Sequence, residues 1–159
     1  MLNIIRTFLT TKAAEMMVNA LITSRLDGLN SLLHDLPENL LNNLQVVQNN
    51  AARLIFKEKK YSHVTHLLKS LHWLPVTYRI KYKINLITFK VMHGLGPKYL
   101  EEMFVPYRPS RTLRSSSMAK LQTKVVKTNW GKRSFSYAAP HLCNKLPKDL
   151  RDITDLTCF

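Results

Sequence analysis

Apolar residues in the first third of the chain recur at helical spacing. Steps of four, four, three and four separate five of them: Val18, Ile22, Leu26, Leu29 and Leu33. This spacing predicts one face of a long helix that begins at a capping threonine, Thr10 or Thr11. Pro37 suits the first turn of a second helix, whose apolar stripe runs through Leu40, Leu44, Val47, Ala51 and Leu54. The pattern therefore predicts an N-terminal αα-hairpin.

The second predicted helix also carries uncharged amide side chains beside or away from its apolar stripe. They are Asn42, Asn43, Gln45, Gln48, Asn49 and Asn50. Amides both donate and accept hydrogen bonds, so this surface would suit a backbone or a partner. A solvated helix face is the simpler interpretation, and it is the one that we expect.

The middle of the chain predicts a short helix from Ser62 to Leu71 and a corner at residues 72–75. A fourth helix runs from Val76 to His93, where Gly94 would end it as a C-cap glycine. Its apolar residues fall on two sides of a helical wheel, with Val76, Ile80, Ile84, Ile87 and Val91 on one side and Tyr78, Tyr82, Leu86 and Phe89 on the other. We expect this helix to be sandwiched at the centre of the fold.

The second half of the chain is more irregular. A short helix from Pro97 to about Phe104 precedes a basic, Ser-rich segment that we interpret as a flexible arm, ordered only on a polyanion. Residues 121–127 suggest a short strand, residues 129–131 a turn, and residues 134–146 a final helix that contains Pro140.

The predicted fold class is mainly α. It is a helical bundle with an N-terminal αα-hairpin, a central two-faced helix and a basic flexible arm, and a short β-hairpin is left open. Four segments follow from this organisation: a helical hairpin (1–58), a second helical region (59–104), the basic arm with its short strand (105–133), and a C-terminal helix and tail (134–159).

Composition adds a strong positive charge to this picture. The 159 residues have 45% hydrophobic content, with four Gly and seven Pro, as expected of one folded domain or two small helical subdomains. Net charge is +14, and residues 76–133 contribute +11 of it, with thirteen Lys/Arg against two Asp/Glu. Such an excess favours an anionic partner, with nucleic acid ahead of a membrane surface.

The candidate nucleic-acid-binding residues form two groups. A basic rail on the fourth helix consists of Arg79, Lys83 and Lys90, which lie within about 40° of one another on the wheel. The basic arm supplies Arg108, Arg111, Arg114, Lys120, Lys124, Lys127, Lys132 and Arg133, with Tyr107 and Trp130 between them. Cations displace the counterions of phosphates, and exposed aromatic rings stack on unpaired bases for about 1–3 kcal/mol each. The alternative is that both aromatics are core residues and the charges only solubilise the chain.

Catalytic and metal-binding motifs are absent from the sequence. It contains no Gly-rich phosphate loop, no G-x-S-x-G, no H-E-x-x-H and no paired acids in an apolar strand, and Glu101 and Glu102 sit on a short amphipathic helix. His63 and His66 have helical spacing but no accompanying Cys or carboxylate cluster, so we expect surface histidines rather than a zinc site. Cys143 is interpreted as a small buried hydrophobe. We therefore expect no enzyme activity, metal or cofactor.

Localisation is predicted from cysteine usage and hydropathy. Two cysteines are too few for a disulfide framework, and no secretory signal is recognisable, so an intracellular protein of the nucleus or cytoplasm is expected. Arg6 and Lys12, with no acid before Glu15, would also fit a weak mitochondrial presequence. No stretch approaches the roughly 20 apolar residues that span a bilayer, so no membrane is expected as a partner.

Six groups of short strings, in order along nearly the whole chain, carry a family resemblance. They are Ala20–Asp27 with Asn30–Leu33, Leu44–Asn49 with Ala51–Ile55, Leu71–Val76 with Arg79–Ile80, Thr88–Lys90 with His93–Leu95, Arg111–Ser116, and Gly131–Pro140 leading to Asn144–Pro147. In these strings the chain resembles the end of the reverse transcriptase of LINE-type non-LTR retrotransposons of the CR1, L2 and jockey groups. Relatives usually have Trp at the position of Cys143 and Tyr-Cys in place of Gly28-Leu29.

The resemblance implies that residues up to about Phe56 correspond to the helical thumb side of the polymerase, and the remainder to the region that follows it. The palm with its Tyr-x-Asp-Asp signature and the endonuclease domain have no counterpart here, which implies a truncated or captured fragment without catalytic activity. The family continues beyond Phe159 into another basic helix. The implied partner is RNA or an RNA–DNA hybrid, bound through its backbone.

Two alternatives to nucleic-acid binding remain open. A helical interaction or scaffold module would dock onto another protein, or onto the polymerase palm, and would expose apolar surface near Met16, Met17 and Leu21. A non-functional relic of the element would have no partner.

Overall fold

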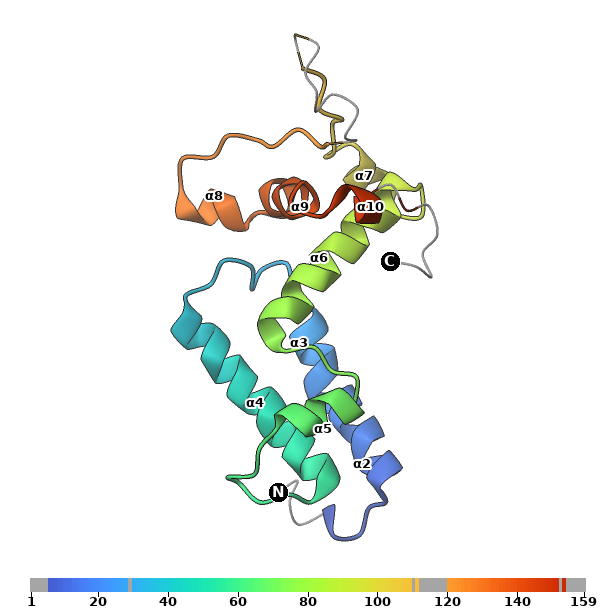
Figure 1. The fold of residues 1–159 in the computed structure, drawn as a ribbon, viewed down its shortest axis with the longest axis vertical. Coiled ribbons are helices and arrows are strands. Elements are labelled where there is room, and N and C mark those ends of the chain that lie inside the picture. Colours follow the sequence, from blue (N-terminus) through green and yellow to red (C-terminus); the bar gives the residue numbers. More distant parts are fainter. Residues whose placement is uncertain (1–5, 29, 110, 112–119, 152, 154–159) are drawn as a thin grey trace. The chain divides into compact units, whose positions relative to one another are not determined.

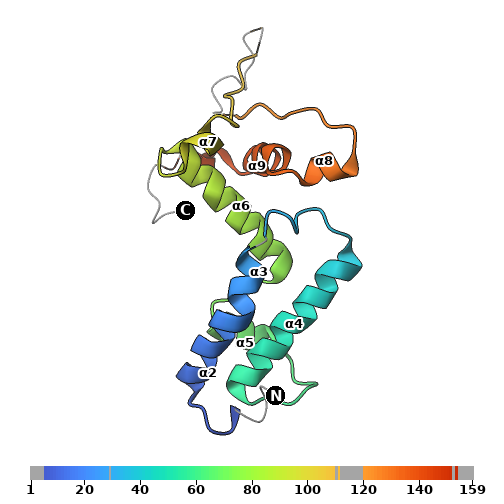
Figure 2. The same ribbon diagram turned by 180° about the vertical axis from the view of Figure 1, so that it is seen from behind.

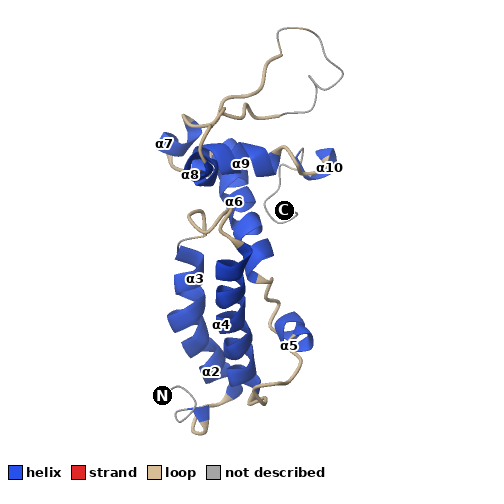
Figure 3. Ribbon diagram, turned by 90° about the vertical axis from the view of Figure 1, so that its left-hand side faces the viewer, coloured by secondary structure: helices blue, strands red, loops and turns tan. Residues whose placement is uncertain are grey.

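A computed structural model of the chain describes residues 6–28, 30–109, 111, 120–151 and 153. The chain divides into two compact units, residues 1–80 (unit 1) and 81–159 (unit 2), with the boundary inside one helix. Helices account for most of the described residues, and none of these residues forms a strand (Figure 3). The predicted mainly α fold class is therefore confirmed at this level.

Unit 1 is built around an αα-hairpin. Its first arm consists of α2 (Thr11–Val18), a π-helical turn (Asn19–Thr23) and α3 (Ser24–Gly28), and its second arm is α4 (Glu38–Phe56). Figures 1 and 2 show the two arms side by side from opposite directions. The side chain of Thr10 accepts a hydrogen bond from the backbone N–H of Ala13 at 3.2 Å, so the predicted N-cap is confirmed.

The first arm ends earlier than the sequence pattern predicted. Instead of continuing to Leu33, the helix stops at Gly28, and residues 30–35 form turns. Gly28 is a poor helix former, and the Asn30 side chain bonds back to the Asp27 carboxylate at 3.2 Å, which gives the chain a local alternative to the helix. The apolar spacing alone did not reveal this competition.

The buried face of α4 also differs from the predicted stripe. Leu40 and Val47 are each 45% exposed, whereas Gln48, Ala51, Ala52 and Ile55 are buried. Two clusters explain the shift. Ala51 and Ile55 pack with Val18 of α2, while Ala52 packs with Val64 and Leu67, which belong to α5 (Thr65–Ser70) and its N-cap. Because α4 serves two neighbours, its buried face is centred on the small alanines between them.

The corner and the central helix follow the prediction closely. The helix α5 begins at Thr65 rather than at Ser62, whose hydroxyl instead donates to the Glu58 carboxylate at 2.8 Å. After the corner, α6 (Val76–Met92) ends just before Gly94, whose φ of 69° is the left-handed conformation expected of a C-cap glycine.

The two apolar sides predicted for α6 are not both buried. Val76, Ile80, Ile84 and Val91 belong to the core, as does Phe89. Tyr78, Tyr82 and Ile87 are exposed. The expectation of a helix buried on both sides was therefore wrong at Tyr78 and Tyr82, whose phenolic oxygens give the rings a polar end that tolerates water, while Phe89 on the same side is buried.

In unit 2, the described residues form the remainder of α6 and four short helices. These are α7 (Lys98–Glu101), α8 (Asn129–Arg133), α9 (Phe135–Cys143) and α10 (Lys148–Arg151). Its core includes Ile84, Phe89, Phe104, Leu121, Ala138, Ala139 and Leu142. Phe104 and Phe135 meet edge to face with their centroids 5.7 Å apart, which attaches the segment after α7 to α9.

Two predictions for unit 2 were wrong. Residues 121–127 do not form a strand; an isolated antiparallel bridge between Pro106 and Leu121 takes its place. The predicted turn at residues 129–131 is instead the first part of α8, because the Thr128 hydroxyl accepts from the Gly131 N–H at 3.1 Å and caps a helix there. The Ser-rich part of the predicted arm, residues 112–119, lies outside the described residues.

None of the helices within the described ranges has both the length and the apolarity needed to cross a membrane.

Candidate nucleic-acid interface

Within the basic arm, residues 105–107 pair with residues 120–122. The backbone N–H of Tyr107 donates to the carbonyl of Lys120, and the N–H of Gln122 donates to the carbonyl of Val105, both at 2.8 Å. This pairing brings Tyr107 and the neighbouring Arg108 beside Lys120, although Tyr107 and Lys120 are thirteen positions apart in the sequence. The arm is therefore tied to unit 2 at its base.

Asn144 holds this base against α9. Its side-chain oxygen accepts from the Leu121 N–H at 2.9 Å, and its side-chain nitrogen donates to the Leu121 carbonyl at 2.8 Å. The amide thus takes both positions that a neighbouring strand would occupy, so Leu121 stays buried without a sheet. In the sequence, Asn144 stands within one of the family strings, and no local pattern there indicates this role.

The helix α8 presents the most prominent aromatic side chain of the interface. Trp130 is 78% exposed, and the guanidinium carbon of Arg133 lies 4.8 Å from its ring centroid, within cation–π range. The N-cap at Thr128 fixes the helix that carries both side chains. A core role for Trp130, the alternative raised by the sequence, is thereby excluded.

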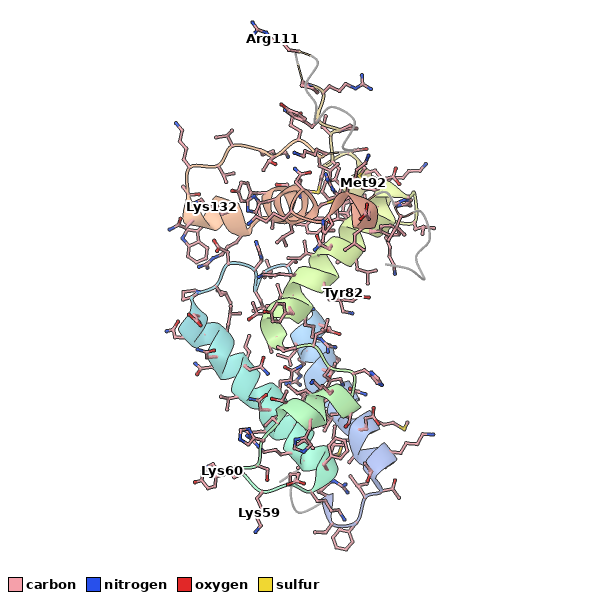
Figure 4. The ribbon with its side chains drawn as sticks, in the orientation of Figure 1. Lys59, Lys60, Tyr82, Met92, Arg111 and Lys132 are labelled. Carbon is pink, nitrogen blue, oxygen red and sulfur yellow. The ribbon has the colours of Figure 1, made fainter. Side chains whose placement is uncertain are left out.

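The remaining arm residues are distributed around this pair. Lys124 and Lys127 are exposed in the stretch that leads to α8, and Lys132 is half-buried on α8 itself. Arg108 and Arg111 are exposed on the preceding stretch, and Figure 4 shows Arg111 well apart from Lys132. Arg114 lies outside the described residues. The structure therefore brings Arg133 into contact with Trp130, while Lys127 and Lys132 lie close to this pair in the sequence and Arg111 lies apart.

The basic rail of α6 is already engaged at one end. Within unit 1, the Arg79 guanidinium binds the Asp27 carboxylate in two places, Nε to Oδ1 at 2.5 Å and Nη2 to Oδ2 at 2.8 Å. Within unit 2, Lys83 and Lys90 are half-buried. A phosphate contact by Arg79 would therefore compete with a bidentate ion pair.

The amide surface predicted on α4 is partly structural rather than solvated. Gln48 is 2% exposed and donates to the Leu74 carbonyl at 2.9 Å, while the Gln45 side-chain oxygen accepts from the Val76 N–H at 2.8 Å. Gln45 also donates to Gln48 at 2.9 Å. The two glutamines satisfy backbone groups at the corner and at the start of α6. The expectation of a solvated face was wrong for this pair.

Cys143 lines a cavity of about 210 Å³ in unit 2, together with Phe89, Leu121 and Leu146. Burial raises the pKa of the Cys143 thiol above its ordinary value, and the nearby Arg151 opposes that shift only in part. The thiol therefore stays protonated at neutral pH and is a poor nucleophile. On the same cavity, the side-chain oxygen of Asn85 is buried without a hydrogen-bond partner among the described residues.

The described part of the chain contains no cluster of three or more His, Cys, Asp or Glu side chains that would hold a metal ion. Comparison with known proteins finds no matching family model, no matching curated protein and no matching solved structure.

Proposed function

We propose that this protein is a non-catalytic, helical fragment of a retrotransposon reverse transcriptase that binds RNA or an RNA–DNA hybrid through its backbone. The observation that carries the proposal is the exposed Trp130 on α8, with Arg133 against its ring and with Lys127 and Lys132 near it in the sequence. An exposed indole among cations is suited to one base and its flanking phosphates.

The chemistry of this surface favours charge and stacking over sequence readout. A base stacked on Trp130 is worth about 1–3 kcal/mol, and each phosphate neutralised by a lysine releases counterions. The cation–π contact positions Arg133 close to the ring before any ligand arrives, so less side-chain freedom is lost on binding. We expect binding without base specificity and with steep salt dependence.

The proposed ancestry rests on the six groups of family strings along the sequence. In that proposal the hairpin of unit 1 corresponds to the thumb side of the polymerase, and the protein acts in the nucleus or cytoplasm, where its RNA would be. The proposal assigns no catalytic step to these 159 residues, which contain neither the palm nor the endonuclease motifs.

Intrinsic fluorescence provides a direct test on the full chain. Of the two tryptophans, Trp130 is exposed and Trp73 is half-buried in unit 1, so quenching by a single-stranded RNA should come mainly from Trp130. Titration at two salt concentrations gives the salt slope, to which each lysine–phosphate contact contributes about 0.7 on single strands. Lys127→Gln should lower that slope, whereas Lys98→Gln on α7 is a matched charge control.

Trp130→Ala should weaken RNA binding about 5- to 150-fold, as expected for the loss of one stacked base. Trp130→Phe, which keeps a ring, should retain most of the affinity. RNA binding that is absent at low salt, insensitive to salt, or unchanged in Trp130→Ala would refute the proposal.

A helical protein-interaction module is the second candidate function. Met16 is 66% exposed and Leu21 is 47% exposed on the first arm of the hairpin, as the sequence predicted for a docking surface. Sedimentation velocity of the wild type and of Met16→Lys/Leu21→Lys tests it. Association that the double variant abolishes supports this candidate, and a wild type that sediments as a monomer at all concentrations argues against it.

A further inference from the structure

A cationic cavity of about 580 Å³ lies in unit 1, at the C-terminal end of α4, and within the range of volumes typical for ligand pockets. It lies outside both groups of residues that the sequence indicated. Its lining comes from the segment before α2, the last turns of α4 and the loop after it: Arg6, Thr7, Asn50, Arg53, Leu54, Lys57, Glu58 and Lys60. Four of these eight residues are cationic, and Glu58 is the one acid among the described residues that line it.

Arg6 is the buried charge of this cavity. Only 5% of it is exposed, and its guanidinium donates to the carbonyls of Leu54 at 2.8 Å, Ile55 at 2.6 Å and Leu9 at 2.6 Å. These three contacts are to neutral oxygens, and no carboxylate of the described residues forms an ion pair with it. A guanidinium has five N–H donors, so two remain for an anion. Because a buried cation without a counter-charge is unfavourable, this guanidinium favours the binding of an anion.

The other lining residues are held in place by the fold. Arg53 donates to the Ser62 carbonyl and to the Asn50 side chain, both at 3.1 Å, and Lys57 is the left-handed C-cap of α4 with a φ of 57°. The Glu58 carboxylate accepts from the Ser62 hydroxyl at 2.8 Å. The guanidinium groups of Arg6 and Arg53 are thus organised before any ligand binds, which reduces the entropy lost on binding.

An aromatic ring lies next to Lys60, one of the residues that line the cavity. The Lys60 Nζ lies 5.7 Å from the ring centroid of Tyr61, and Tyr61 is 90% exposed. Cations near a helix C-terminus are also favoured by the helix dipole, and that effect contributes at Arg6 and Lys57. It does not account for Lys60 or for an uncovered tyrosine beside it. A cationic cavity next to an exposed ring has the chemistry of a nucleotide contact.

We propose that this cavity binds a backbone phosphate of a single-stranded nucleic acid, with the adjacent base stacked on Tyr61. Arg6 and Arg53, which are held by hydrogen bonds to backbone carbonyls, supply part of its positive charge, and Lys57 and Lys60 supply the rest. It is a separate site from α8, so the chain has one nucleic-acid contact in each unit. The site goes beyond the function proposed above, because neither Trp130 nor the basic arm contributes to it.

Adjacent lysines provide a matched test. Figure 4 shows Lys59 and Lys60 on the same loop with diverging side chains, and only Lys60 lines the cavity. Lys60→Gln and Lys59→Gln remove the same charge from exposed positions, so both variants should fold. Each is made in the full chain on a Trp130→Ala background, where the α8 contact is weakened. Binding of an eight-nucleotide single-stranded RNA is then measured, together with photocrosslinking of a 4-thiouridine version.

Lys60→Gln should weaken RNA binding about tenfold and lower the salt slope of binding by about 0.7. Lys59→Gln should change the RNA affinity by less than about twofold. Tyr61→Ala should also weaken binding, and the crosslinked peptide should contain Tyr61. Equal effects of the two lysine variants, or no effect of either, would overturn the proposal.

The source of the phosphate is tested on the same variants. Binding of phosphatidylserine vesicles that depends on Lys60, with no such dependence for RNA, would also overturn the nucleic-acid proposal. Failure at this site is distinguishable from failure of the proposed function, because loss of RNA binding in Trp130→Ala is measured with Lys60 and Tyr61 intact.

Discussion

At the base of the arm, loss of the Asn144 side-chain amide should have the most direct effect on local stability. Asn144→Ala removes both hydrogen bonds to the backbone of the buried Leu121, at 2.9 and 2.8 Å, and leaves its N–H and C=O without these partners. The change adds no bulk and no charge. Any effect on residues 120–122 must therefore come from the lost bonds and the small space left behind.

The expected magnitude follows from two hydrogen bonds at a buried residue. Each hydrogen bond contributes about 1 kcal/mol net, so the loss of both should destabilise the folded arrangement around Leu121 by at least about 2 kcal/mol. If water reaches the unpaired N–H and C=O only incompletely, the destabilisation rises to about 4 kcal/mol. Because about 1.4 kcal/mol corresponds to a factor of ten, amide exchange at Leu121 should accelerate by about 30- to 1,000-fold. Lys120 loses its fixed position, so RNA affinity should fall by a few-fold.

Hydrogen exchange followed by NMR measures this at a single amide. Asn144→Asp is the matched variant, because its carboxylate still accepts from the Leu121 N–H but cannot donate to the carbonyl. Exchange at Leu121 should therefore be slower in Asn144→Asp than in Asn144→Ala. If Leu121 exchanges at the wild-type rate in Asn144→Ala, the reasoning is refuted, since the side chain would then not be what protects that amide.

Two further predictions concern charge. Asp27→Asn removes the bidentate partner of Arg79. The side chains of Arg79 and Asp27 are 16% and 24% exposed, intermediate between a surface pair and a buried pair, so the free energy of unfolding should fall by about 1–3 kcal/mol. Urea titration measures this change, and an unchanged midpoint would show that the pair is not stabilising. Cys143 should react with iodoacetamide in a Cys158→Ser background with a pH midpoint above 9.0, because burial raises the pKa of its thiol, and urea should return the midpoint to its ordinary value. The pKa of the thiol is higher in the folded protein than in the unfolded chain, so the stability linked to this thiol is complete below pH 9 and is lost as the pH rises further. Equilibrium unfolding measured as a function of pH tests this loss. A reaction midpoint at or below 9.0 in the folded protein would contradict both statements.

Local signals in the sequence were sufficient for the helical hairpin, the corner and the central helix. Thr10 caps the first helix, and Gly94 follows the end of α6 with a positive φ, because both residues act through their own backbone neighbourhood. The same local chemistry was overlooked at Thr128, which caps α8 where a turn had been expected. A threonine three residues before Gly131 was the signal that would have indicated it.

The candidate site was predictable in composition but not in arrangement. Charge concentration identified Lys127, Lys132 and Arg133, yet only the structure decided that Trp130 is exposed rather than part of a core. The cavity around Arg6 was not predictable, because Arg6 and Lys60 lie in separate, unremarkable segments and meet only when the chain folds at the end of α4. The charge of a sequence segment does not predict which distant residues come together in the folded chain.

By itself, the sequence determined the helical class, the hairpin and the concentration of positive charge, since periodicity, caps and charge are properties of neighbouring residues. Tertiary structure alone decided which face of α4 is buried, that Gln45 and Gln48 bond the corner and the start of α6, and that Asn144 holds the base of the arm. The physical reason is that a buried polar group must find a partner, and that partner is 26 residues away for Gln48 and 23 for Asn144.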